Sequence, residues 1–378
     1  MRGVKRPEAP ILVSEMESAV TSMMCSLLSG LALVLSLSSC SENPEPRRNN
    51  DPDRYTLVED VPWAAPGGFD LAMDIYTPAS GKDSYPVVVM FHGGGWLIND
   101  KSIMDQASAY LATNSEYVIC NVDYRLLSDN DNSVLLNEIV DDVFGAVLWV
   151  KDHVGQYKGD RDRIAVTGDS AGGHLSAMIV NLGDRIGSEP FSSASLRFQP
   201  SYLPAGKTAE QVAQDRGLEV QAAILSYGAF DLFQGATEGF ESLLNPFWLV
   251  SGSIARGLFG DDHNVVDHPE LYRALSPFHN IPPSTERLLP PQLLTVGTDD
   301  PIVTPASVEA YLEKLRSAGH PTEYWSYEEK THAFLDSGTN AFLGSSFEAD
   351  APPALDVMIR FLDGVFYAEQ GEGDSGRL

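Results

Sequence analysis

Basic residues are scarce in this chain. It has 25 Lys and Arg against 53 Asp and Glu, so the formal charge at neutral pH is −28. A surface of that sign repels a polyphosphate backbone, which excludes nucleic acid as an expected partner. The acidity by itself identifies no substrate, because a solvated, repulsive surface is an ordinary feature of well-dispersed proteins.

Cysteine is also scarce, with three in 378 residues: Cys25, Cys40 and Cys120. Cys120 lies in the apolar run 117–122 and would be the one thiol of the mature chain besides Cys40. We interpret it as an unpaired residue that fills the core.

Long hydrophobic runs are missing as well. The run 23–37 is too short and too rich in serine to cross a bilayer comfortably, and it is typical of the central region of a signal peptide. We therefore predict that residues 1–39 are a signal peptide. Because Arg2 and Lys5 lie far from this run, translation starting at Met23 or Met24 is an open alternative.

The run ends in Leu37-Ser38-Ser39-Cys40, which resembles a bacterial lipobox. That resemblance implies that Cys40 is acylated, becomes the first mature residue and anchors the protein to a bacterial membrane on its extracytoplasmic side. An ordinary cleaved signal peptide is the alternative. Residues 40–54 have too little apolar content to pack, so we expect a flexible tether there.

One α/β domain is predicted over residues 55–368, with a frayed tail at 369–378. Continuous apolar runs are typical of parallel strands covered on both faces, and amphipathic segments between them predict packing helices. The predicted central strands are 86–91, 117–122, 163–167, 221–226 and 292–296, and the main helices 133–153 and 304–318. Residues 69–76 alternate in polarity, which predicts an edge strand.

Two stretches interrupt this alternation, 184–217 and 230–283. Long insertions above the carboxyl ends of strands commonly form lids or pocket walls. The second is rich in Phe, Leu, Trp and Gly. Its aromatic residues and Trp96 line a substrate pocket in one interpretation and belong to the core in the other.

Ser170 is the candidate nucleophile. It is the serine of a GxSxG motif at 168–172, between an apolar strand and a helix-compatible stretch. The glycines allow a turn sharp enough to expose the hydroxyl above the sheet. The motif also occurs by chance, as a plain turn rich in Gly and Ser.

The motif His-Gly-Gly-Gly-Trp at 92–96 directly follows the strand 86–91. Successive glycines let several backbone amides converge on one point, as a tetrahedral oxyanion requires. We predict that the amides of Gly94, Gly95 and Ala171 hold the oxyanion, with Gly93 shaping the loop.

A serine nucleophile needs an imidazole base and a carboxylate that orients it. His332 comes after the last predicted strand, 322–327, where the base is expected. We expect the other late histidine, His320, at a polar turn in contact with solvent. For the acid we favour Asp300, because its place before Pro301 suits a turn that directs the carboxylate inward, although Asp299 and Asp231 are alternatives.

Together these motifs resemble the α/β-hydrolases of the carboxylesterase and acetyl-esterase type, close to the hormone-sensitive-lipase-like and the xylan or feruloyl esterase branches. The resemblance rests on segments 73–78, 92–96, 122–126, 162–174, 297–303 and 331–334. It implies an α/β-hydrolase fold with lid or cap insertions and a serine carboxylic-ester hydrolase that needs no metal or organic cofactor. It also implies that Asp123 and Arg125 support the oxyanion loop.

The substrate is left open by the sequence. Residues 127–129 lack the Ala-Pro-Glu of the hormone-sensitive-lipase branch, and Trp96 is similar to the tryptophan of carbohydrate-acting esterases and arylformamidases. The expected substrate is a carbohydrate ester, polymeric or small, or another small ester. The alternatives are an arylformamidase, a peptidase of the same fold, and a hydrolase fold that only binds its ligand.

Overall fold

The computed structural model describes residues 54–192 and 194–368. The predicted signal peptide, the anchor Cys40, the tether up to residue 53 and the tail 369–378 lie outside the described residues. Within the described ranges, no helix has the length and apolar composition needed to cross a membrane.

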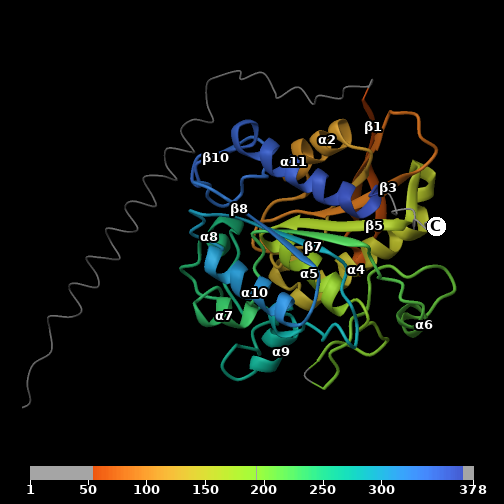
Figure 1. Cartoon of the computed structure of the whole chain (residues 1–378). Coiled ribbons are helices and arrows are strands. Elements are labelled where there is room, and N and C mark those ends of the chain that lie inside the picture. The colour runs from red at the N-terminus through yellow and green to blue at the C-terminus, as the bar shows by residue number, and fades with distance from the viewer. Residues whose placement is uncertain (1–53, 193, 369–378) are drawn as a thin grey trace, which may run out of the picture. The chain divides into compact units, whose positions relative to one another are not determined.

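An eight-stranded sheet forms the centre of the domain, in the order β1-β2-β4-β3-β5-β6-β7-β8 (Figure 1). β1 pairs antiparallel with β2, and β2 pairs antiparallel with β4. The remaining pairs, which join β4, β3, β5, β6, β7 and β8 in that order, are all parallel. This arrangement confirms the predicted mostly parallel α/β fold. The strands are β1 (Tyr55–Ala64), β2 (Leu71–Pro78), β3 (Tyr85–Phe91), β4 (Val118–Val122), β5 (Gly159–Asp169), β6 (Ala222–Ser226), β7 (Gln292–Gly297) and β8 (Thr322–Tyr327).

The predicted edge strand is not at the edge. β2 lies second in the sheet, because β1 pairs along its outer side. Its polar position Asp74 is buried and satisfied there: the carboxylate accepts a hydrogen bond from the Asp60 amide at 2.7 Å and lies 3.4 Å from Lys101 Nζ. The alternating polarity of residues 69–76 therefore reflects a buried ion pair at Asp74 and not a solvent-exposed face of the strand.

Helices cover both faces of the sheet. In Figure 1, α2 and α11 lie on one side of the strands, and α4, α5 and α10 lie on the other. The predicted packing helices correspond to α4 and α10. The helices are α2 (Asp105–Asn114), α3 (Asp129–Asn132), α4 (Leu136–His153), α5 (Ala171–Leu182), α6 (Ala209–Gln214), α7 (Leu232–Thr237), α8 (Pro246–Ser251), α9 (Pro269–Ala274), α10 (Pro305–Ser317) and α11 (Phe347–Phe366). Short 3-10 helices occur at Pro66–Gly68, Lys101–Met104, Val154–Tyr157 and Pro277–His279.

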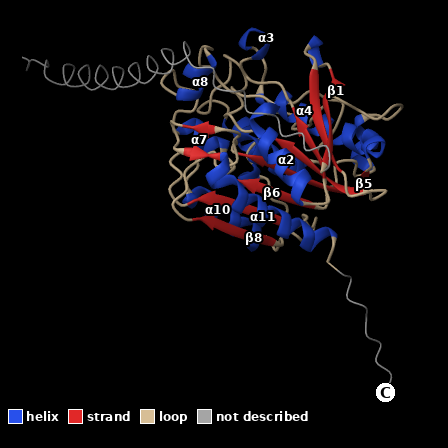
Figure 2. Ribbon diagram, turned by 90° about the horizontal axis from the view of Figure 1, so that it is seen from above, coloured by secondary structure: helices blue, strands red, loops and turns tan. Residues whose placement is uncertain are grey.

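The two insertions occupy different places. The stretch 184–217 packs along α4, where the amides of Gln199 and Ser201 both donate to Asp141. The stretch 230–283 contains α7 and α8, which lie on the side toward which the arrowheads of the central strands point (Figures 1 and 2). The second insertion is thus the one placed to border a site at the carboxyl ends of the strands.

A two-stranded sheet follows β8 at the same side. It consists of β9 (Thr339–Asn340) and β10 (Ser345–Ser346), paired antiparallel. Thr331 Oγ1 donates to the Leu343 carbonyl at 2.7 Å, which ties this hairpin to the loop that carries His332.

Candidate active site

Ser170 stands at a sharp turn between β5 and α5. Its φ of 51° and ψ of −114° lie in a region that L-residues rarely adopt. The turn brings backbone against backbone, because a Cβ on Gly172 would lie 1.9 Å from the Phe91 carbonyl oxygen and one on Gly168 would lie 2.4 Å from Gly172. Only glycine fits at either position, so the two glycines of the motif are needed for space.

The structure brings Ser170, His332 and Asp300 together, although they lie far apart in the chain. Ser170 Oγ is 2.9 Å from His332 Nε2, and His332 Nδ1 is 2.7 Å from Asp300 Oδ2. All three side chains are buried. The hydroxyl, the imidazole and the carboxylate thus form one continuous chain of hydrogen bonds.

Asp300 is held in place by its own turn. Its Oδ1 accepts hydrogen bonds from the amides of Ile302 and Val303 at 2.8 and 2.9 Å, which leaves Oδ2 for the imidazole. The two alternative acids lie elsewhere. Asp299 is exposed, and Asp231 caps α7 and contacts His279 at 3.2 Å.

Tyr227 is a contact of the imidazole that the sequence analysis did not identify. It directly follows β6, its ring centroid lies 4.7 Å from that of His332, and it is fully buried. Its hydroxyl accepts a hydrogen bond from the Leu335 amide at 3.3 Å, so it holds both His332 and the chain beyond it. Its position directly after the central strand β6 is the sequence feature from which a residue of the site could have been expected.

His320 differs from its prediction. It is buried instead of solvated, because Nδ1 accepts from the Leu289 amide at 3.3 Å and Nε2 lies 2.7 Å from the Pro282 carbonyl. The polar turn around it is thus closed over by the segment that leads into β7.

The glycine loop after β3 lies against the serine turn. A Cβ on Gly172 would be 2.8 Å from the His92 carbonyl, and one on Gly93 would be 2.3 Å from Asp169 Oδ2. Gly94 and Gly95 have φ of +118° and +61°, which glycine adopts without strain. Ala171 is the first residue of α5, so its amide has no partner inside the helix.

His92 supports this loop as a neutral side chain. Burial lowers its pKa to about 4, and its Nδ1 donates to the Gly93 carbonyl at 2.8 Å. Tyr124 stacks on the imidazole at 4.3 Å between ring centroids and donates its hydroxyl to the His92 carbonyl at 2.6 Å.

The expected supports Asp123 and Arg125 bond elsewhere. Arg125 forms a bidentate pair with Asp142 of α4, with both N–O distances at 2.8 Å, and Asp123 accepts from the Lys101 amide at 2.7 Å. Their neighbours hold the loop instead. Besides Tyr124, the Leu127 amide donates to the Trp96 carbonyl at 2.7 Å.

The aromatic residues divide between core and site. Trp96 and Trp248 are buried, as is Phe230, which agrees with the core interpretation. Phe247 instead covers the glycine loop, because a Cβ on Gly95 would lie 2.9 Å from its ring. The ring of Phe240 contacts that of Trp96 edge-on, with 5.5 Å between the ring centroids.

Asp169, beside the nucleophile, is a buried carboxyl. It is 1% exposed, and its Oδ1 has no hydrogen-bond partner among the described residues. Burial raises the pKa of Asp169 to about 6, although attraction to His332 and a hydrogen bond from the Gly93 amide oppose that shift. The protonated carboxyl is therefore the form that the fold favours in weak acid.

We expect Asp169→Asn to stabilise the protein at pH 8 by about 1–3 kcal/mol, since it removes a buried charge. The folded pKa lies above the unfolded value near 3.8, so the contribution of this carboxyl to stability is lost as the pH rises from about 4 through 6. Urea unfolding at several pH values measures this. The gap between variant and unmodified protein should close near pH 4, and a gap of equal size at both ends would contradict the assignment.

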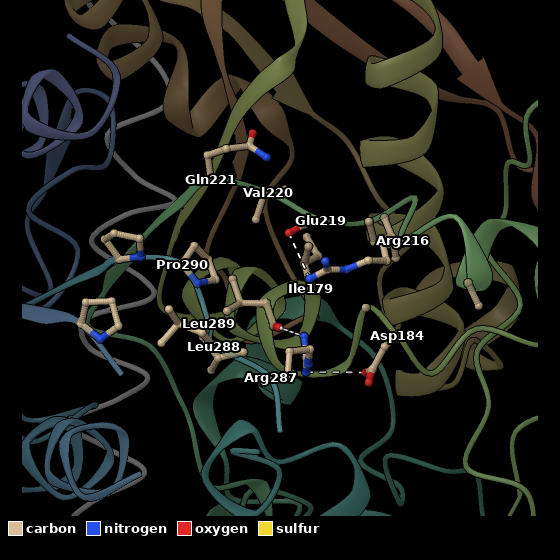
Figure 3. Close-up of a pocket in the computed structure, with 16 residues that line it drawn as sticks. Ile179, Asp184, Arg216, Glu219, Val220, Gln221, Arg287, Leu288, Leu289 and Pro290 are labelled. Carbon is tan, nitrogen blue, oxygen red and sulfur yellow. Dashed lines mark hydrogen bonds and ion pairs between the residues drawn. The ribbon is translucent and has the colours of Figure 1, made fainter. Parts of the chain in front are cut away.

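A separate groove of about 410 Å³ lies where the strands β6 and β7 begin, at the end of the sheet away from Ser170 (Figure 3). It is lined by Gln221 and Pro291, which precede β6 and β7, and by the end of α5. Arg287 in its wall donates to the Val180 and Asn181 carbonyls and lies 3.5 Å from Asp184. The groove is thus distinct from the Ser170 site, and this charged group is satisfied within the protein.

Comparison with known proteins identifies the family. Residues 73–315 match the family model described as BD-FAE. Carboxylesterase NlhH of Mycobacterium tuberculosis (strain ATCC 25618 / H37Rv) is 28% identical over 71% of this chain and 72% of its own length. The arylesterase of Saccharolobus solfataricus is 26% identical over 71% of this chain and 74% of its own.

Among solved structures, esterase Est2 of Thermogutta terrifontis is similar to this chain with a TM-score of 0.58. It is 22% identical, and the match covers 88% of this chain and all of Est2. That likeness confirms the fold. The chain belongs to the BD-FAE family, has the α/β-hydrolase fold and is a carboxylesterase.

Proposed function

We propose that Ser170, His332 and Asp300 are the catalytic triad of this esterase. The observation that carries the proposal is the unbroken chain of hydrogen bonds, 2.9 Å from Ser170 Oγ to His332 Nε2 and 2.7 Å from His332 Nδ1 to Asp300 Oδ2. A serine hydroxyl becomes a strong nucleophile only when a base removes its proton, and this geometry supplies that base.

These three groups supply every proton transfer that acylation of Ser170 and hydrolysis of the acyl-enzyme require. Ser170 Oγ bonds to the ester carbonyl carbon while its proton moves to His332 Nε2, and Asp300 stabilises the imidazolium. The tetrahedral intermediate then expels the alcohol oxygen, which takes the proton from His332. Water repeats the sequence on the acyl-enzyme, releasing the carboxylic acid and restoring Ser170.

In this proposal, the developing oxyanion lies between the glycine loop and α5. We assign its binding to the amides of Gly94, Gly95 and Ala171, with Gly93 shaping the loop against Asp169. Supporting this, the loop and the first turn of α5 are in backbone contact, and donors fixed in advance need no reorganisation during the reaction.

The acyl group proposed is small. Phe247 lies over Gly95 and packs against Phe240, which contacts Trp96, and this cluster of rings at the glycine loop supports a small acyl group. The alcohol part is proposed to be a carbohydrate or another small alcohol. Hydrolysis rates for esters of increasing acyl length, together with an acetylated polysaccharide, measure both choices.

The triad predicts covalent labelling by a serine-reactive organophosphate. The folded protein should be labelled at Ser170, and Ser170→Ala should not be labelled. Ser307→Ala, which changes an exposed serine of α10, should be labelled like the unmodified chain. A folded chain that resists the probe would instead support a hydrolase fold that only binds its ligand. Turnover of an aryl formamide or a peptide faster than of any ester would favour those alternative reactions.

A further inference from the structure

A cluster of exposed apolar side chains covers α8 and the turns on either side of it. Leu243, Leu244, Leu249, Val250 and Ile254 are between 59% and 76% exposed. We call these five residues the α8 surface. These five residues fall within twelve successive positions, 243–254, around one short helix, and a dense group of exposed apolar side chains usually marks contact with another molecule or with a membrane.

The α8 surface is uncharged in a chain whose formal charge is −28. Residues 242–255 contain no Asp, Glu, Lys or Arg. The charges that flank this segment are both bonded within the protein. Glu241 accepts from the Tyr272 hydroxyl and the Leu258 amide, and Arg256 donates to the Leu127 and Val134 carbonyls.

The other side of α8 touches the candidate active site. Phe247 lies on Gly95 of the glycine loop, and Trp248 Nε1 donates to the Phe240 carbonyl at 3.0 Å. Figures 1 and 2 place α8 on the side where the central strands end. One short segment therefore turns aromatic rings toward the site and aliphatic side chains toward solvent.

We propose that the α8 surface docks the protein onto an uncharged lipid surface, next to the entrance of the Ser170 site. Transfer of Leu, Val and Ile side chains from water into an acyl layer is favourable, and no charge on this segment opposes that transfer. Anionic lipid would repel so acidic a protein, so a zwitterionic bilayer is the matching surface. A second copy of the chain fits less well, because two such acidic molecules repel each other.

Docking is a property additional to ester hydrolysis, because it determines whether the enzyme encounters its ester substrate in a lipid layer or in solution. Esters lying in the lipid layer are presented to Ser170, whereas dissolved esters reach it without docking. Ser170→Ala is expected to dock normally. A failure of docking is thereby distinguishable from a failure of the proposed catalysis.

A polarity-sensitive dye tests the contact directly. The full chain with Cys25→Ser and Cys40→Ser, which prevents acylation, carries the dye on Val250→Cys, while Cys120 is buried. Phosphatidylcholine vesicles should shift the emission to shorter wavelength, and phosphatidylglycerol vesicles should do so less. The matched control is Leu288→Cys, which is 63% exposed beside the remote groove and should show no shift.

Kinetics test the consequence. The double change Leu243→Ser and Leu244→Ser should lower hydrolysis of an ester dispersed in phosphatidylcholine vesicles by about tenfold or more, with turnover of a dissolved short ester retained. Leu288→Ser should lower neither rate. The proposal is overturned if the dye at position 250 does not respond, if positions 250 and 288 respond alike, or if the shift follows protein concentration without vesicles, which would indicate a second copy.

Discussion

Ser170→Ala is expected to lower kcat for a short-chain aryl ester by about 10³- to 10⁶-fold while the protein stays folded. Alanine removes the only atom that bonds to the acyl carbon, Oγ, which lies 2.9 Å from His332 Nε2. The amides of the glycine loop and α5 stay in place, so residual rate above the uncatalysed reaction is expected.

The loss should fall on kcat and not on binding, since the alanine side chain clears space near the substrate. Steady-state kinetics on purified protein, with far-UV circular dichroism to verify the fold, measure this. Ser307→Ala on the exposed side of α10 is the matched control. Unchanged turnover by the Ser170 variant would remove the triad proposal.

Asp300→Asn is expected to lower kcat by about 10⁴-fold with little change in stability. Asp300 Oδ2 accepts the Nδ1 proton of His332 at 2.7 Å, which leaves Nε2 free to take the serine proton. An amide NH₂ at the same place donates to Nδ1, so the imidazole proton moves to Nε2 and faces the hydroxyl. The base is then in the wrong tautomer.

Asp299→Asn is the control for this change, because it alters the same charge one residue away on an exposed side chain. We expect its kcat to stay within about twofold, as for a surface charge screened by solvent. Comparing kcat/KM of the two variants on one ester tests the assignment. Equal losses, or a greater loss at position 299, would show that the acid has been misassigned.

The three residues of the proposed triad and the glycine loop were predictable because each lies beside a local signal. Ser170 lies in a turn that only glycine neighbours allow, and the glycine loop directly follows an apolar strand. Parallel strands end at one edge of a sheet, so residues after those strands converge there. His332 followed from the same rule, and Asp300 was preferred over Asp299 because of the turn at Pro301.

Other features were not predictable, because they depend on contacts between distant segments. Asp74 looked like the wet face of an edge strand, yet β1 and Lys101 bury it. His320 was expected in water and is covered by the segment before β7. Local polarity cannot report which segment will pack over a residue from elsewhere in the chain.

The sequence by itself determined the fold class and the three residues proposed to form the triad, because close backbone packing and strand order leave few residue types acceptable at those positions. The ester chemistry was implied by the resemblance to carboxylesterases and is shown by the comparisons with known proteins. Only the tertiary structure decided that Tyr227 packs on the base, that Asp169 is buried beside the nucleophile and that α8 turns aliphatic side chains to solvent next to the site. Burial and contact are properties of segments brought together in space, and no local pattern in the chain encodes which segments those are.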